Sequence, residues 1–348
     1  MRLFDYARAT ALMEEAGIDL ILANSMINVS YLLDYYGSQT LFTPSMVLDD
    51  GSMYYQSFAG LPADEQLEAF FTPWVGEAGY LCDGATWVQD LRYYGQPIVT
   101  PGLETTSHPQ AVDPISCAVM AIKDRKLESS HIGMELQLLP TDTCRRLCAA
   151  LPHATIIDAG PTLSRLRAIK SPEEVARMHL ASRVTEKALQ TAYDSVRAGS
   201  TELEFEHMLQ VTLAEESAGC LWTHVAFGPK GAADIVPRET PVHPGEPLRA
   251  DIGGTHRGYV CDMSRVGVLG QPQKLCRRQW MQSSSPIMPS AKLFEPAFAR
   301  ATCIVLVPRR CSVMDMSSSY PPSATGLGET YTSGPTYSPI ATILSRQV

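Results

Sequence analysis

Apolar and polar positions repeat at helical and strand periods through the first part of the chain. Residues 5–17 carry apolar side chains at helical spacing and end at Gly17, which predicts an amphipathic helix. Residues 19–23 are a short apolar run, typical of a buried strand. Three further elements are predicted in this part: a hairpin over 41–55, a helix over 87–94, and a strand entering a helix at 130–135. This alternation of strands and helices indicates an α/β domain over residues 1–158.

Aromatic side chains concentrate in residues 28–37, Asn-Val-Ser-Tyr-Leu-Leu-Asp-Tyr-Tyr-Gly. Aromatic rings bury large areas, so this segment is expected to pack in the core of the α/β domain. The same half of the chain contains no glycine-rich phosphate loop and no nucleophile elbow. The first domain therefore shows no sign of nucleotide binding or of serine-hydrolase chemistry.

A change of pattern at residues 156–161 predicts the start of a second domain. Ser171 is a natural helix N-cap, a proline takes the first helical position, and Glu174 completes a capping box. Apolar residues on one face predict an amphipathic helix over 172–196. A second capped helix is predicted over 202–214. By themselves these residues indicate two capped amphipathic helices and no particular chemistry.

Two carboxylates, Asp251 and Asp262, stand eleven residues apart in a segment rich in glycine. Residues 248–253 and 259–268 read as two strands joined by a tight turn over 253–258. Such a hairpin is expected to place the two carboxylates opposite each other. Facing carboxylates repel unless a proton or a metal ion neutralises them, and hard oxygen ligands suit Mn²⁺, Mg²⁺ or Zn²⁺. The alternative is a pair of solvated turn carboxylates, because an Asp pair alone is a weak motif.

The full segment is more specific than the spacing of its two carboxylates. It resembles the metal-binding hairpin of the aminopeptidase P, prolidase and creatinase family, whose fold is called pita-bread. The residues that carry the resemblance are Gly245-Glu246, Asp251-Ile252-Gly253, Gly258-Tyr259, Asp262 and Arg265. A second match is the helix entry Arg-Ala-Ile-Lys-Ser-Pro-Glu-Glu at 167–174. The resemblance implies two bound divalent ions, with manganese as the expected metal. Asp251 would chelate one ion, and Asp262 would bridge both.

The resemblance also implies the fold class and its limits. It implies an α/β N-terminal domain like that of creatinase and prolidase over 1–158, followed by a truncated α+β pita-bread catalytic domain over 159–270. Members of the family carry a substrate-binding histidine, which counting back from Asp251 would place near residue 234 or 235, where this chain has none. His224 and His243 are the candidate substitutes for it.

The composition changes after Gly270. Residues 271–348 contain twelve serines, nine prolines and three acidic residues, and the last histidine of the chain is His256. This segment is therefore expected to be an aberrant tail, such as a frameshift would produce, or a disordered one. The family's remaining ligands, one His and two Glu, belong to later strands, so the resemblance implies a catalytic site that is impaired here.

Charge and cysteine content limit the partners and the compartment. The formal net charge of −9 argues against nucleic acid and against an anionic membrane surface as partners. The nine cysteines form no Cys-x-x-Cys pair, although Cys144 and Cys148 lie four residues apart on a predicted helix. With no signal peptide or membrane span recognised, a cytoplasmic location with reduced thiols is expected. A homodimer is among the expected assemblies.

The resemblance implies a metal-dependent hydrolase of the Xaa-Pro peptidase type, acting on a peptide or small amide, with activity reduced by the missing ligands. Two alternatives remain at this point. One is a non-peptidase enzyme, similar to creatinase or ectoine hydrolase, that cleaves a C–N bond in a small metabolite. The other is a catalytically inactive truncated product.

Overall fold

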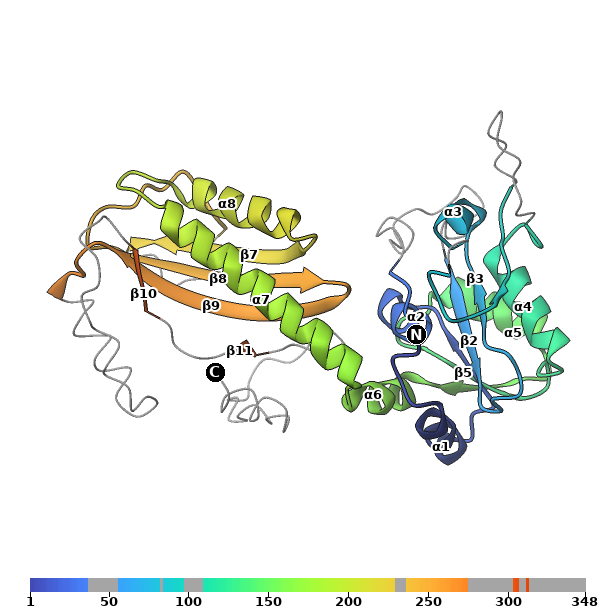
Figure 1. Cartoon of the computed structure of the whole chain (residues 1–348). Helices are drawn as coiled ribbons and strands as arrows, with labels where there is room; N and C mark the ends of the chain where they lie inside the picture. Colours follow the sequence, from blue (N-terminus) through green and yellow to red (C-terminus); the bar gives the residue numbers. More distant parts are fainter. Residues whose placement is uncertain are drawn as a thin grey trace, which may run out of the picture. The chain divides into compact units, whose positions relative to one another are not determined.

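The structure is a computed structural model that describes residues 1–36, 56–81, 84–96, 109–228, 236–274, 303–306 and 311–312. The contacts divide the chain into two units, Met1–Glu174 and Val175–Val348 (Figure 1). Each unit has its own sheet and its own core, so each is described by itself. The predicted hairpin over 41–55 lies outside the described residues.

A mixed six-stranded sheet forms the centre of the first unit. Its spatial order is β4-β3-β2-β1-β5-β6. The pairs β1–β5, β5–β6 and β3–β4 are parallel, whereas β2 runs antiparallel to both of its neighbours. The strands are β1 (Leu20–Ala23), β2 (Phe58–Pro62), β3 (Phe70–Thr72), β4 (Asp90–Leu91), β5 (His131–Met134) and β6 (Thr155–Asp158).

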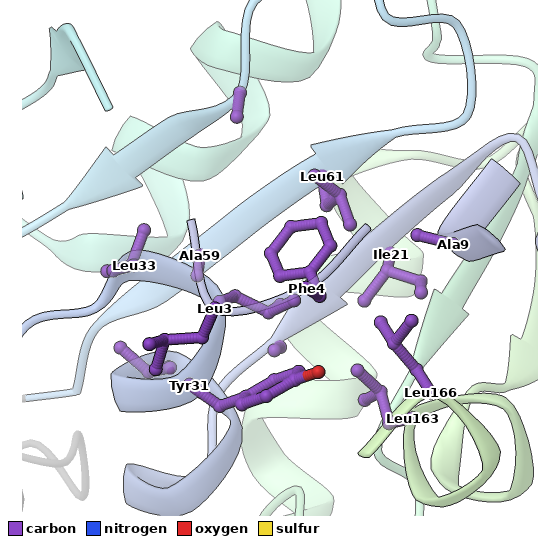
Figure 2. Packing of buried hydrophobic residues seen from close by; sticks show 14 of the residues in the cluster. Leu3, Phe4, Ala9, Ile21, Tyr31, Leu33, Ala59, Leu61, Leu163 and Leu166 are labelled. Carbon is purple, nitrogen blue, oxygen red and sulfur yellow. The ribbon is translucent and has the colours of Figure 1, made fainter. Parts of the chain in front are cut away.

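Helices pack on both faces of this sheet (Figure 1). Alternate residues of β1 explain why: Ile21 joins one buried cluster and Leu22 joins the other, so the central strand is apolar on both sides. Figure 2 shows the first cluster, where Leu163 and Leu166 lie close to Ile21. The helices are α1 (Tyr6–Ala16), α2 (Met26–Leu33), η2 (Val75–Glu77), α3 (Ala78–Leu81), α4 (Pro114–Asp124), α5 (Thr141–Ala150) and α6 (Gly160–Ala168).

Local signals placed several of these elements correctly. The predicted first helix is α1, capped by Asp5, whose side chain accepts a hydrogen bond from the N–H of Ala7 at 2.9 Å. Gly17 ends it in the left-handed region at φ 65°. In the aromatic segment, Tyr31 and Tyr35 are both buried, as expected.

The helix predicted over 87–94 is wrong, because this segment contains strand β4. Phe70 and Phe71 of β3 pair in parallel with Asp90 and Leu91. The indole N–H of Trp87 donates to the carbonyl oxygen of Leu32 at 2.8 Å, which anchors the entry to the strand. A ladder partner distant in sequence decided the conformation, and the local pattern carries no trace of that partner.

The second unit contains most of the first predicted capped helix, α7 (Pro172–Ser195), and all of the second, α8 (Glu202–Glu215). The N–H of Ser171 donates to Glu174 Oε2 at 2.7 Å, and the N–H of Glu174 donates back to Ser171 Oγ at 3.3 Å. Thr201 forms the same reciprocal box at the start of α8. The sequence therefore predicted both helix starts correctly, because a capping box is complete within four residues.

An antiparallel sheet with the order β10-β9-β8-β7 forms the rest of the second unit, and β11 also pairs with β9. Helices α7 and α8 lie on one face of it (Figure 1). Between the helices and the sheet is a core that includes Tyr193, Phe205 and Ile252. The strands are β7 (Gly219–Phe227), β8 (Pro247–His256), β9 (Tyr259–Leu269), β10 (Cys303–Leu306) and β11 (Cys311–Ser312).

The boundary between the units falls later than the predicted end of the first domain at residue 158. Helix α6 places Leu163 and Leu166 in a core of the first unit, and the division lies between Glu174 and Val175. Of the predicted tail, 271–348, the structure describes 271–274 and the strands β10 and β11, and the remainder lies outside the described residues. Within the described part, no helix is both long and apolar enough to cross a membrane.

Candidate metal-binding hairpin

The hairpin predicted around Asp251 and Asp262 is formed by β8 and β9 (Figure 1, orange). Its turn is Arg257-Gly258 alone, and His256 pairs with Tyr259. Both turn residues have positive φ, 47° and 77°, as a two-residue hairpin turn of the favoured twist requires. The predicted turn over 253–258 was therefore too long, and β8 continues through the glycine pair to His256.

Gly253 and Gly254 are close-approach glycines rather than turn glycines. A Cβ on Gly253 would overlap the ring of Trp222, and a Cβ on Gly254 would overlap Oγ1 of Thr185 on α7. The missing side chains let an indole lie on one face of the strand and a helix pack on the other. The glycine pair in the sequence does mark positions that need glycine, but the reason is close packing and not a turn.

The register places the two carboxylates on one face but not opposite each other. Asp251 pairs with Ser264, and Asp262 pairs with Gly253. Residues two apart on a strand share a face, so Asp251 and Asp262 are diagonal neighbours. The expectation of directly opposed carboxylates is wrong, because the shorter turn shifts the pairing by two residues. The two side chains still point away from the helices, since Ala250 and Ile252 belong to the helix-facing core.

His224 lies on β7 directly across from Asp251. The ladder therefore sets His224, Asp251 and Ser264 in one row across three strands, all half-buried. We call the surface formed by Trp222, His224, Arg249, Asp251, Asp262 and Ser264 the Asp251 face.

His243 lies elsewhere. It is exposed on the loop before β8, four residues ahead of the strand, and its backbone N–H donates to Glu246 Oε2 at 3.0 Å. The register does not bring it beside Asp251. Of the two histidines predicted to bind substrate, the structure sets only His224 next to the carboxylates.

Arg249 is a member of the Asp251 face that the sequence reading missed. Its Nη2 donates to Asp251 Oδ2 at 2.9 Å, and the two side chains are 23% and 22% exposed. The signal was available, because residues two apart on a predicted strand share a face. Arg265, in contrast, is buried on the helix side, where it pairs with Glu186 of α7. This arginine of the family pattern therefore links the sheet to helix α7 on the face opposite the Asp251 face.

The donor chemistry of this face fits a hard divalent cation, since carboxylate oxygens from two strands point to one side. Asp251 already forms an ion pair with Arg249, so a cation at Asp251 would compete with a guanidinium. Within the described residues, no three His, Cys, Asp or Glu side chains gather closely enough to hold a metal ion. Asp251 and Asp262 therefore suit a divalent cation as two of its ligands, and the described residues supply no complete set of metal ligands.

A model of a known protein family matches the part of the chain that contains this hairpin. The profile of metallopeptidase family M24 matches residues 176–282, which include most of α7, all of α8 and the strands β7 to β9. A Xaa-Pro dipeptidase of Lactobacillus helveticus is 27% identical over 169 residues, 46% of this chain and 45% of the relative. An uncharacterized peptidase of Bacillus subtilis is 23% identical and covers 58% of each chain. The chain thus spans about half the length of these curated relatives.

Solved structures show the same fold. An X-Pro aminopeptidase of Thermotoga maritima superposes with a TM-score of 0.58 at 20% identity, over 79% of this chain and 67% of that one. A Xaa-Pro dipeptidase of Bacillus anthracis gives a TM-score of 0.59 at 18% identity, over 78% and 66%. The α/β sheet of the first unit and the antiparallel sheet of the second therefore resemble the prolidase fold.

Proposed function

The chain carries a segment of metallopeptidase family M24, residues 176–282, and from this premise we propose that the Asp251 face binds a divalent metal ion for amide-bond hydrolysis. Asp251 and Asp262 are the two ligands within the described residues. The observation that carries the proposal is their common face in the β8–β9 register. Such a cation, when bound, polarises a carbonyl group and activates water.

The substrate class we propose is the Xaa-Pro peptide. The support is the similarity to a Xaa-Pro dipeptidase in sequence and to aminopeptidase P and prolidase structures in fold. His224 is the residue we assign to substrate binding, because it is half-buried and faces Asp251 across the ladder. An imidazole in this row can donate a hydrogen bond to a substrate carbonyl beside the ligands.

We further propose that this 348-residue chain turns over slowly. Two carboxylates leave most positions around a cation without protein ligands, and efficient metal catalysis needs a fixed coordination geometry with outer hydrogen bonds. Residues 257–348 contain no histidine, so they supply no imidazole ligand. In this proposal the described residues supply two ligands, Asp251 and Asp262, and no complete ligand set.

The first test measures Mn²⁺ binding to the full chain. Isothermal titration calorimetry gives the affinity, and the loss of the free Mn²⁺ signal in electron paramagnetic resonance gives an independent measure of binding. The unmodified chain should bind, and Asp251→Asn and Asp262→Asn should each abolish measurable binding. Asp194→Asn is the matched control, because it removes an exposed carboxylate of α7 in the same unit. Equal binding by all four proteins would refute the assignment of the ligands.

The second test is turnover of a Xaa-Pro dipeptide and a longer Xaa-Pro peptide with added Mn²⁺. We expect rates far below the range of about 1–10³ s⁻¹ that is ordinary for enzymes. Turnover within that range, abolished by Asp262→Ala, would contradict the impaired site. A parallel panel of small amides would reveal a non-peptidase C–N hydrolase, the alternative that the sequence left open.

A further inference from the structure

A pair of thiols lies on α5 in the first unit, outside the hairpin and its chemistry. Cys144 is half-buried and Cys148, one helical turn later, is exposed. Burial, together with the electrostatic interaction with the neighbouring Cys148, raises the pKa of Cys144. Leu147, on the buried side of the same helix, packs in the core and holds the helix in place. The pair is thus presented on a fixed scaffold.

The charged neighbours of this pair already have partners. Arg145 forms an ion pair with Asp142, and Arg146 lies 3.4 Å from Asp113. Neither guanidinium is therefore dedicated to a thiolate. Within the described residues, no third His, Cys, Asp or Glu joins the pair to form a metal-binding group of three. A tetrahedral zinc site with four ligands is not formed there.

Helix geometry decides what two thiols at this spacing can do. The Cβ atoms of residues i and i+4 lie about 5–6 Å apart on a helix. A disulfide needs Cβ atoms about 3.5–4.5 Å apart, so closing one would distort α5. An ion between the sulfurs adds two metal–sulfur bonds of about 2.3 Å each, which spans the gap without moving the backbone. The spacing therefore favours a bridging ion over a disulfide.

We propose that Cys144 and Cys148 form a two-thiolate site for a soft cation of the Cu(I) type, which prefers sulfur ligands and accepts two of them. Binding replaces both S–H protons, so one Cu(I) enters and two protons leave, with no change of oxidation state. The site is independent of the proposed peptidase function, since it uses another unit and another ligand type.

The test is a Cu(I) titration of the full chain under anaerobic conditions against a competing chromogenic chelator. Cys144→Ser and Cys148→Ser should each weaken the site by about 10²–10⁴, the usual gain from a second linked contact. Cys220→Ser is the matched control, because Cys220 is a partly buried thiol in the other unit, and its titration should equal that of the unmodified chain. Circular dichroism should be the same for all four proteins.

Two outcomes would overturn the proposal. In the first, both serine variants bind the same number of Cu(I) equivalents, with the same affinities, as the unmodified chain, which would place all copper on other cysteines. In the second, peroxide treatment converts Cys144 and Cys148 into a disulfide, detected as a 2 Da mass loss in the peptide that contains both, without loss of helix signal. That result would show that the helix tolerates the shorter sulfur separation, and the geometric argument would fail.

Discussion

Arg249 is the residue that most directly modifies the proposed metal site. Its guanidinium contacts Asp251 Oδ2 at 2.9 Å from the same strand face, and it pairs across the ladder with Ala226 and Val266. A cation that binds Asp251 must compete with this ion pair and lies near a positive charge. A residue that the sequence reading passed over is thus expected to lower the metal affinity.

Arg249→Gln should therefore tighten Mn²⁺ binding. An ion pair of this exposure contributes about 0.2–1 kcal/mol, which corresponds to a Kd lower by a factor of about 1.4 to 5. Calorimetric titration measures the change, and Arg257→Gln in the exposed hairpin turn is the control. Weaker Mn²⁺ binding in Arg249→Gln would mean that the guanidinium supports the site instead of competing for it.

Glu77 is a second residue with a definite pH signature. It is 3% exposed, it accepts a hydrogen bond from the hydroxyl of Tyr35, and its other oxygen has no partner among the described residues. Burial raises its pKa above the ordinary 4.5, although the hydrogen bond from Tyr35 opposes this. The protonated form of Glu77 is therefore more favoured in the folded state than in the unfolded state.

The sign of the effect on stability follows from that shift. Below pH 4.5 the acid is protonated whether folded or not, and its contribution to stability is complete. As the pH rises through the folded pKa, the contribution is lost, with a slope of at most about 1.4 kcal/mol per pH unit. Glu77→Gln should remove this slope in urea melts between pH 4 and 8. An unchanged slope in the variant would show that other groups produce it.

At the scale of elements, the hairpin is held from the helix side. The hydroxyl of Tyr193 on α7 lies 3.2 Å from the carbonyl oxygen of Leu248 and 3.0 Å from that of Arg265, so one side chain contacts both strands. Glu202, at the start of α8, has no exposed surface. Its two oxygens accept hydrogen bonds from the N–H groups of Phe227 at 2.9 Å and Arg238 at 3.0 Å.

Glu202→Ala should destabilise the second unit by about 2–5 kcal/mol, because two buried N–H groups would lose their acceptors. Glu202→Gln keeps one acceptor and should cost less. Glu215→Ala is the matched control, since it removes an exposed carboxylate at the other end of α8 and should stay within about 0.5 kcal/mol. Chemical denaturation provides the measurement. A loss below about 1 kcal/mol for Glu202→Ala would show that water replaces the carboxylate.

At the scale of the whole molecule, each unit has a core of its own. Leu22 is buried in the first unit and Leu209 in the second, and they belong to separate clusters. Deleting a buried leucine side chain to the Cβ costs about 2–5 kcal/mol. Because the cores are separate, each of these substitutions should destabilise only the unit that contains it.

Differential scanning calorimetry should therefore resolve two transitions. Leu22→Ala should lower one of them, Leu209→Ala should lower the other, and saturating Mn²⁺ should raise only the transition that Leu209→Ala lowers. A metal ion at 100 times its Kd stabilises the unit that binds it by about 2.7 kcal/mol. If either variant lowered both transitions equally, the two units would be folding as one cooperative body.

The sequence by itself determined the features that short-range physics controls. The boxes Ser171/Glu174 and Thr201/Glu204 and the left-handed Gly17 each involve four or fewer consecutive residues, so the helix ends could be read directly. The hairpin segment was likewise recognisable, because it resembles a known family, and a model of metallopeptidase family M24 matches residues 176–282.

Only the tertiary structure decided which side chains meet. The segment at 90–91 became a strand because β3 supplies its ladder partner. The register of Asp251 against Ser264, rather than against Asp262, follows from the place of the turn. Gly253 and Gly254 lie within β8, where Trp222 and Thr185 occupy the space that a Cβ atom would fill. Contacts between residues far apart in the chain set all three outcomes, and the free energy of such contacts leaves no periodic mark in the local sequence.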